Sequence, residues 1–164
     1  SEIAHGIVGS EMCIRDRPIS EQEFPEVFPV VKQALYEHVD SVFGWDEQFQ
    51  QHRLSTDYKP EWFQWVVSKQ NKIGLVCFKP YDTAYHIHLL ILFPQYQNQG
   101  FGHIVMQQIN TLVKSEGRNK ITLSSFTRNT KAIQFYTRLG YQVTEEDECF
   151  VSMTLDLEQQ KMDY

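Results

Sequence analysis

The chain has few cysteines, and their arrangement suggests neither a disulfide nor a metal site. Cys13, Cys77 and Cys149 are odd in number and widely separated, and their spacing fits neither a CxxC pair nor a set of metal ligands. We therefore expect reduced, structural thiols, no bound metal and a cytoplasmic location.

The chain also lacks an excess of basic residues and any long apolar run. Lysine and arginine total 15, aspartate and glutamate total 21, and the formal net charge is −6. This balance disfavours a nucleic-acid partner, which usually requires a basic face. No stretch is long enough to span a membrane, and the N-terminus lacks the apolar core of a signal peptide. We expect neither a nucleic-acid partner nor a membrane partner.

What is present is typical of one globular domain. The chain has 164 residues, 41% of them hydrophobic, and no repeat, low-complexity tract or linker divides it. We expect a single domain over residues 13–157, an N-terminal segment of unassigned role over 1–12, and a frayed C-terminal tail over 158–164.

The apolar spacing predicts an alternation of helices and strands. Ser20 and Glu23 have the spacing of a capping box, and the helix after them contains Pro25 and Pro29, so it should start late or kink at Pro29. The other expected helices are a polar one over 46–54, one from Phe101 to a stop at Gly117, and one over 132–139. The expected strands cover 62–67, 72–78, 85–93, 121–126, 141–143 and 149–155, with a turn at 79–82. This order predicts a mixed α/β sheet with helices packed on its faces.

The turn after the longest apolar run contains two closely spaced glycines, Gly100 and Gly102, in the segment QYQNQGFGH. A helix N-terminus attracts anions, and residues without a Cβ let a phosphate approach the backbone closely. A plain strand-to-helix turn explains the same glycines equally well. A Walker loop is absent, and a dinucleotide fingerprint would need a third glycine where Val105 stands.

Two blocks of the sequence resemble one protein family. Gln97-Asn98-Gln99-Gly100-Phe101-Gly102 matches the pattern Q/R-x-x-G-x-G/A, and Leu92-Phe93-Pro94 precedes it like the family's V-x-P. Asn129-Thr130-Lys131-Ala132-Ile133-Gln134-Phe135-Tyr136 with Leu139-Gly140-Tyr141 is similar to N-x-x-A-x-x-x-Y-x-x-x-G-F. Both patterns are motifs of the GNAT superfamily of acetyl-CoA-dependent N-acetyltransferases, and the chain resembles this family in its order of helices and strands from about residue 13 to residue 155.

This resemblance implies a fold and a cosubstrate. The fold would be a GNAT-like mixed, mostly antiparallel sheet of six or seven strands, with helices on both faces and a splay between the fourth and fifth strands. Acetyl-CoA would place its pyrophosphate on the N–H groups of residues 98–102, although Gln99 stands where the family often has a basic residue. The cofactor-binding residues implied are Leu90, Leu92, Gln97, Asn98, Gln99, Gly100, Phe101, Gly102, Asn129 and Phe135.

The resemblance also suggests which residues do the chemistry. Tyr136 would be the general acid, and a half-buried core aromatic is the alternative reading. His86 and His88 are candidates for the general base, and we expect both to point the same way as Leu90 and Leu92. Trp45, Asp46 and Glu47 would lie in the acceptor pocket, while the two carboxylates could equally stabilise a helix N-terminus.

The implied activity is transfer of the acetyl group to a primary amine by direct attack in a ternary complex. Two alternatives stay open: a non-catalytic acyl-CoA-sensing or protein-binding module on the same fold, and a transferase for another acyl group. The sequence does not identify the acceptor amine, and pairing into a homodimer through edge strands is possible.

Overall fold

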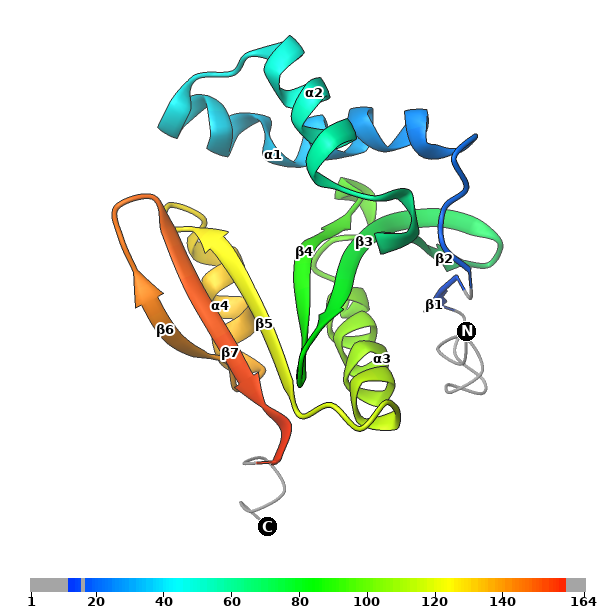
Figure 1. Cartoon of the computed structure of the whole chain (residues 1–164), viewed down its shortest axis with the longest axis vertical. Helices are drawn as coiled ribbons and strands as arrows, with labels where there is room; N and C mark the ends of the chain where they lie inside the picture. Colours follow the sequence, from blue (N-terminus) through cyan, green and yellow to red (C-terminus); the bar gives the residue numbers. More distant parts are fainter. Residues whose placement is uncertain (1–11, 16, 159–164) are drawn as a thin grey trace.

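The structure of the protein is a computed structural model that describes residues 12–15 and 17–158. Two sheet halves diverge from a shared base and form a V, and α1 (Val27–Phe43) and α2 (Glu47–Asp57) lie across its open end (Figure 1). The expected roles of residues 1–11 and 159–164 fall outside the described residues.

Within the described residues the sheet has seven strands in the order β1-β2-β3-β4-β5-β7-β6. Every neighbouring pair is antiparallel except β4–β5, which is parallel. This confirms the expected mixed sheet. The strands are β1 (Met12–Ile14), β2 (Phe63–Ser68), β3 (Asn71–Tyr81), β4 (Ala84–Leu92), β5 (Lys120–Phe126), β6 (Gln142–Glu146) and β7 (Phe150–Asp156).

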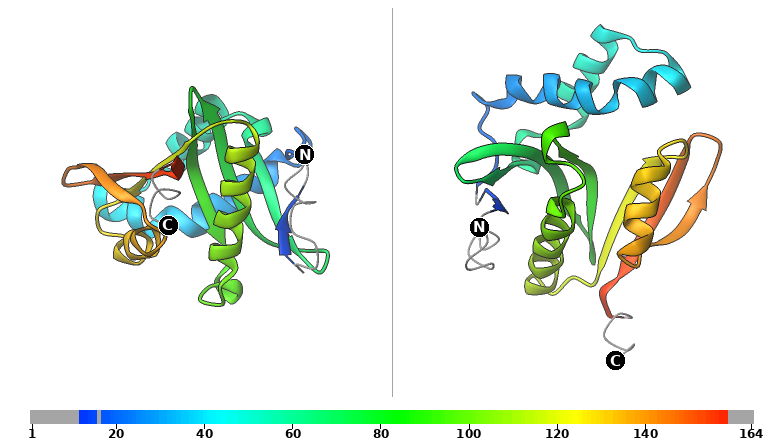
Figure 2. Two further views of the ribbon diagram at one scale, coloured as in Figure 1. Left: turned by 90° about the horizontal axis from the view of Figure 1, so that it is seen from below. Right: turned by 180° about the vertical axis from the view of Figure 1, so that it is seen from behind.

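Two further helices flank the V on the face away from α1 and α2. They are α3 (Phe101–Ser115) and α4 (Thr130–Arg138), seen on either side of the divide when the molecule is viewed from behind (Figure 2). Gly117 and Gly140, with φ of 75° and 99°, follow these helices. Left-handed backbone of this kind is where glycine commonly ends a helix.

Some boundaries differ from expectation. The segment 79–82 was predicted as a turn, but β3 continues to Tyr81, and the reversal falls at Asp82, whose φ is 56°. Pro80 is accommodated within the strand opposite Tyr85. The helix expected after Ser20 does start late, because a 3-10 turn (Phe24–Glu26) precedes α1. Pro29 therefore sits in the first turn of α1, where a missing N–H costs nothing.

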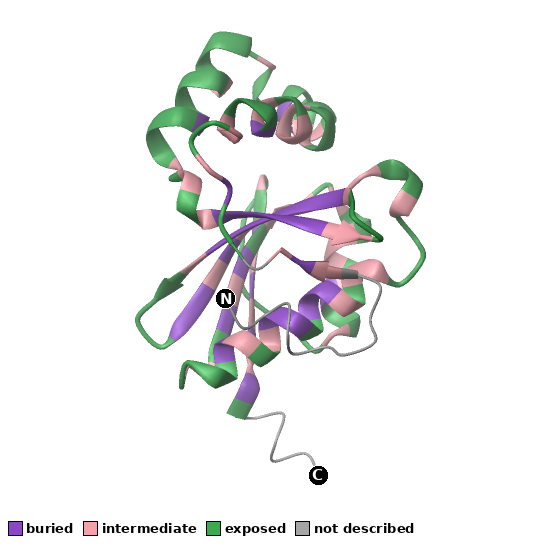
Figure 3. Ribbon diagram, turned by 90° about the vertical axis from the view of Figure 1, so that its right-hand side faces the viewer, coloured by how far each residue is buried: buried purple, intermediate pink, exposed green. Residues whose placement is uncertain are grey.

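The apolar residues form two clusters, one on each face of the sheet. The larger cluster lies beneath α3 and α4 and includes Val76, Ile109, Ile121 and Met153. The smaller lies beneath α1 and α2 and includes Phe63 and Leu75. β2 and β3 are mostly buried, whereas much of α1 and α2 is exposed (Figure 3) and every residue of β6 is exposed.

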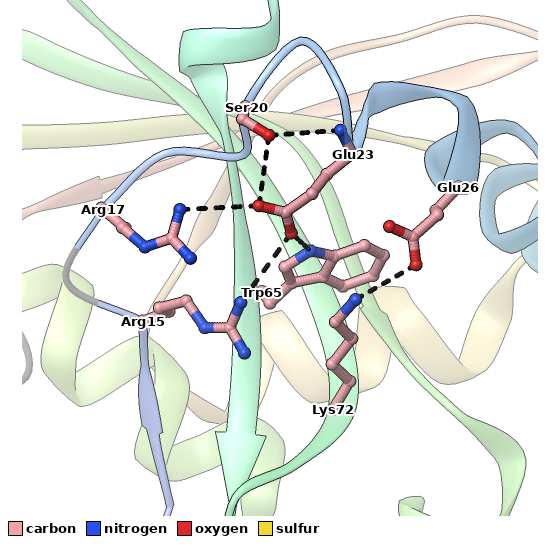
Figure 4. A network of polar contacts seen from close by, with 7 residues as sticks. All are labelled: Arg15, Arg17, Ser20, Glu23, Glu26, Trp65 and Lys72. Carbon is pink, nitrogen blue, oxygen red and sulfur yellow. Dashed lines mark hydrogen bonds and ion pairs between the residues drawn. The ribbon is translucent and has the colours of Figure 1, made fainter.

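A polar network fixes the start of the α1 region to the sheet (Figure 4). The Trp65 Nε1–H donates to the Glu23 carboxylate at 3.0 Å, and Arg15 and Arg17 pair with the same carboxylate at 3.8 and 3.5 Å. Ser20 accepts from the Glu23 N–H at 3.2 Å. The contact between Ser20 and Glu23 thus forms as the spacing predicted, and the Glu23 carboxylate also joins the segment after β1 to Trp65 on β2.

Candidate functional site

The loop between β4 and α3 exposes a row of backbone donors. After β4 come a 3-10 turn (Pro94–Tyr96) and two residues with positive φ, Asn98 at 60° and Gly100 at 84°. Gly100 is the N-cap of α3, in the left-handed region that glycine adopts most readily. The first N–H of the helix to donate a backbone bond is that of Ile104, to the Gly100 carbonyl. The backbone N–H groups of residues 98–102 have no acceptor in the described part of the chain.

Two glutamine side chains hold this loop in shape. Gln97 Nε2 donates to the Leu92 carbonyl at 2.9 Å, and Gln99 Nε2 donates to the Gln95 carbonyl at 2.7 Å. Both side chains therefore bind backbone within the loop. The anion-binding capacity of the segment lies in its N–H groups and in the positive end of α3.

The second glycine allows close packing between two helices. A Cβ placed on Gly102 would lie 3.1 Å from Cζ of Phe135 on α4 and 3.8 Å from a methyl of Leu92. A Cβ on Gly100 would meet nothing within 4 Å. The two glycines thus serve different purposes, since Gly100 supplies the backbone conformation and Gly102 supplies space beside Phe135.

The strand before this loop is paired on one side only. β4 pairs with β5 from Ala84 to Ile87, and residues 88–92 have no partner in β5. On its other side β4 stays paired with β3 as far as Leu92. The backbone around Leu90 thus faces the opening between the two sheet halves, as the splay predicted from the sequence requires.

His86 and His88 do not point the same way as Leu90 and Leu92, so that expectation was wrong. The β3–β4 register shifts between Cys77 and Phe78 and leaves His88 without a partner, which is a β-bulge. One extra residue reverses the side-chain alternation beyond it. Leu90 and Leu92 therefore pack with the α3 cluster, and the histidines lie on the α2 side.

His86 is joined to the neighbouring strand by its side chain. Its Nδ1 lies 2.8 Å from Oγ1 of Thr122, its register partner in β5. Burial, with a smaller effect of the Lys79 ammonium, lowers the pKa of His86 below its usual value. The ring is thus neutral at pH 7, and Thr122 restrains one of its two nitrogens.

His88 is enclosed by aromatic rings. Its ring stacks on Trp62 at 5.4 Å between centroids and meets Tyr58 edge-on at 5.3 Å. The Nε2 atom is buried without a partner. Burial lowers the pKa of His88 to about 4, with smaller contributions from His86, Lys79 and Arg53. Such a ring is a weak base at neutral pH.

Tyr136 lies in the core on α4, beside Phe135 and Tyr141. It is 8% exposed, and burial raises the pKa of its phenol well above the usual value, so the hydroxyl remains protonated. Asn129 acts as the N-cap of α4 and accepts from the Ala132 N–H at 3.3 Å. Asn129 at the N-cap and Tyr136 within α4 lie two helical turns apart.

Trp45 and Asp46 lie in the connection between α1 and α2, and Glu47 is the first residue of α2. Asp46 caps α2 by accepting from the Phe49 N–H at 3.0 Å. Glu47 accepts from the Trp45 indole at 2.8 Å and pairs with Lys32 at 2.9 Å. Both carboxylates thus have structural partners, while Trp45 lines a cavity of about 30 Å³, room for about one water molecule.

β5 and β7 carry a polar surface that was not predicted from the sequence. Thr122 and Ser124 alternate with the buried Ile121 and Leu123, and the Ser124 hydroxyl lies 3.2 Å from that of Ser152 on β7. Cross-strand partners share a face, so these hydroxyls lie on the same side of the sheet as His86. The alternation of apolar and polar residues in ITLSSF, residues 121–126, could have indicated this polar face.

The far end of α1 reaches the β5–β7 half of the sheet. His38 stacks on Phe126 at 5.5 Å and its Nδ1 lies 2.9 Å from Nη1 of Arg128. Phe43 contacts Phe150 at 6.0 Å between ring centroids. Helix α1 therefore bridges the two sheet halves across the open end of the V (Figure 1), on the side to which His86 points.

No group of three or more His, Cys, Asp or Glu side chains that could hold a metal ion occurs in residues 12–15 and 17–158. Over the same residues, no helix is long and apolar enough to cross a membrane.

Comparison with known proteins identifies similar sequences and folds. Residues 32–141 match the acetyltransferase (GNAT) family. A curated relative, peptidyl-lysine N-acetyltransferase YjaB of Salmonella typhimurium, is 29% identical over 97 residues. That alignment covers 58% of this chain and 61% of the relative, so the chain spans about three fifths of the relative's length.

Solved structures show the same fold at low sequence identity. The PaiA N-acetyltransferase of Thermoplasma acidophilum, crystallised with coenzyme A, aligns with a TM-score of 0.71 and 16% identity over 88% of this chain and 98% of its own. The ribosomal-protein-S18-alanine N-acetyltransferase of Escherichia coli aligns with a TM-score of 0.64 and 15% identity over 89% and 94%. Because the family match spans more than half of the sequence and the fold agrees with it, the chain belongs to the GNAT family of acetyltransferases.

Proposed function

We propose that this protein transfers the acetyl group of acetyl-CoA to a primary amine by direct attack within a ternary complex. One observation carries the proposal. The unpaired N–H groups of residues 98–102 lie at the end of β4, where β4 has parted from β5. A row of amides at a helix N-terminus suits a pyrophosphate, and the gap beside β4 suits the pantetheine arm.

The cofactor arm would run along the free side of β4. Backbone groups near Leu90 would pair with the pantetheine and the thioester carbonyl, as strands pair with an added strand. The Leu92 carbonyl already accepts from Gln97, so pairing there requires either that the side chain move or that the carbonyl use its second lone pair. Asn129 and Phe135 would line the opposite wall.

His86 is the stronger candidate for the base. In the reaction the amine nitrogen attacks the thioester carbon, the new C–N bond forms, and the C–S bond breaks. The ammonium group must lose a proton because its pKa is near ~10.4. If Nδ1 of His86 donates to Thr122, Nε2 carries the lone pair that accepts this proton. His88, with a pKa of about 4 and its ring enclosed, is better suited to packing.

Tyr136 would supply the proton for the departing thiolate. The hydroxyl is protonated at neutral pH, and the thiol formed has a pKa near ~8.5. Burial makes the phenol a weaker acid, so the donation depends on the thiolate lying within hydrogen-bond distance.

We further propose a lysine side chain as the acceptor class to test first. The protein has a formal net charge of −6, which favours cationic partners. The curated relative is named for peptidyl-lysine acetylation. The acceptor would enter between α1 and the face of β5 and β7 that carries the hydroxyl groups. The side chains of Trp45, Asp46 and Glu47 would lie beside it. A homodimer and a cytoplasmic location remain predictions.

The test is an acceptor panel with product identification by mass spectrometry. Acetyl-CoA would be incubated with lysine-containing peptides, peptides with a free N-terminus as the only amine, and small amines. Acetylated product with matching release of free CoA supports the proposal. Binding of the cofactor without transfer to any amine favours the sensing module, and turnover with propionyl-CoA or succinyl-CoA alone favours another acyl group.

A further inference from the structure

A second cavity lies between α3 and α4, on the face of the sheet opposite His86. Its volume is about 260 Å³. His103, Gln107 and Asn110 line it from α3, Arg138 lines it from α4, and Tyr141 lines it from the segment after α4. Seen from behind, α3 and α4 stand apart on the two sides of the V (Figure 2). The cavity is thus separate from the acceptor side.

Two polar atoms of this cavity have no partner in the protein. Tyr141 is only 3% exposed, and its hydroxyl is buried without a hydrogen bond. The Oδ1 atom of Asn110 is likewise buried without a hydrogen bond. Burying a polar group without a hydrogen bond is unfavourable, so two such groups on one cavity indicate a polar occupant.

The donors around the cavity favour an anion. Arg138 lies in the last turn of α4 and makes no ion pair within the described residues. Burial, and secondarily the nearby Tyr136, raises the pKa of Tyr141, so its hydroxyl stays a donor. The oxygen and nitrogen of an Asn side chain are told apart only by their hydrogen bonds. Turning the Asn110 amide by 180° would therefore present its NH₂ group to the cavity. A guanidinium, a phenol and an amide together fit a phosphate group.

The cavity begins next to the proposed pyrophosphate site. His103 follows Gly102 directly, and Asn110 lies seven residues further along α3, about 10 Å at the rise of a helix. Acetyl-CoA carries a phosphate monoester on its ribose in addition to its pyrophosphate. A ligand whose pyrophosphate rests on residues 98–102 could therefore direct that second phosphate into the cavity.

We propose that the α3–α4 cavity binds a phosphate monoester through Arg138 and Tyr141. This inference rests on the proposed function for one of its two sources, the 3′-phosphate of the cofactor. The other source is a separate phosphate-bearing small molecule, for which inorganic phosphate is the simplest probe.

The experiment compares CoA with dephospho-CoA by calorimetry at fixed ionic strength. If the cavity takes the 3′-phosphate, wild type binds CoA more tightly than dephospho-CoA by roughly tenfold or more, as expected for a charge-assisted bond. Arg138→Gln and Tyr141→Phe lower this ratio toward one and leave dephospho-CoA binding unchanged. Lys114→Gln, an exposed change elsewhere on α3, keeps the ratio. Thermal melts verify that each variant is folded.

If the phosphate comes from a separate molecule, CoA and dephospho-CoA bind equally, and inorganic phosphate stabilises wild type but not Arg138→Gln. A ratio of one with no effect of phosphate would overturn the proposal, as would a ratio that neither variant changes. Dephospho-CoA keeps the pyrophosphate and the pantetheine, so failure of the proposed function appears separately as loss of its binding.

Discussion

Gly102 in the first turn of α3 lies against the ring of Phe135 on α4, with little room for a methyl group between them. A Cβ on Gly102 would lie 3.1 Å from Cζ of Phe135, closer than carbon atoms normally pack. This contact sets the spacing of the two helices on either side of the proposed cofactor arm.

Gly102→Ala should therefore weaken acetyl-CoA binding by roughly tenfold, since overpacking of this kind costs about 1–3 kcal/mol. The fold should persist, because alanine favours a helix more than glycine does. Calorimetry measures the loss, and adding Phe135→Leu should restore affinity by relieving the clash. An unchanged affinity in Gly102→Ala would show that the helix spacing does not matter for the cofactor.

Tyr136→Phe keeps the ring and its packing and removes only the hydroxyl. General acid catalysis is typically worth about 10²–10⁴-fold, so kcat should fall by this amount, with little change in cofactor affinity or thermal stability. Steady-state kinetics with any accepted amine measures the effect. Wild-type turnover in the variant would leave Tyr136 as a core residue only.

Thr122 should act through His86. Thr122→Val removes the oxygen 2.8 Å from Nδ1 and keeps the shape, so kcat at neutral pH should fall about tenfold and the acidic limb of the pH–rate profile should move. Thr122→Ser keeps the hydroxyl and should retain most of the activity. His86→Gln should remove that limb altogether. If Thr122→Val keeps the wild-type profile, Thr122 does not act on His86, and if His86→Gln keeps the acidic limb, the base must be sought elsewhere.

His88 should make the fold sensitive to acid. Its folded pKa of about 4 lies below the usual 6.5, so the unfolded chain binds the proton more tightly. The stability it contributes is complete above pH 6.5 and is lost as the pH falls from 6.5 toward 4. Denaturant unfolding over this range should show a decrease in the free energy of unfolding that His88→Leu reduces; because the ring is only half-buried and partly screened by solvent, we expect on the order of 2 kcal/mol. An NMR titration of the His88 ring centred near 6.5 would contradict this.

Local patterns predicted the loop and the helices around it. Gly100 was identified from its place between an apolar run and an amphipathic helix, and its φ of 84° agrees with that reading. The role predicted for Gly102 was to let a phosphate group approach the backbone closely. Its contact with Phe135 gives it a packing role as well, which no pattern within one segment could reveal.

The faces of β4 could not be predicted, because the bulge at His88 depends on register with β3. Simple alternation placed His88 and Leu90 together, whereas the extra residue separates them. The stacking of His38 on Phe126 joins residues far apart in the sequence, and its position on α1 gave no signal. The contacts of the Asp46 and Glu47 carboxylates likewise depend on how α1 and α2 pack together, which no local pattern gives.

The proposed acetyl transfer depends most directly on binding of the cofactor by the loop after β4 and by the splayed end of β4. Isothermal titration of acetyl-CoA into the wild-type protein tests it without any knowledge of the acceptor. We predict one molecule bound per chain, thermal stabilisation that grows with cofactor concentration, and loss of both when Gly102 is replaced by valine. The absence of both heat and stabilisation in wild type at millimolar acetyl-CoA would contradict the account.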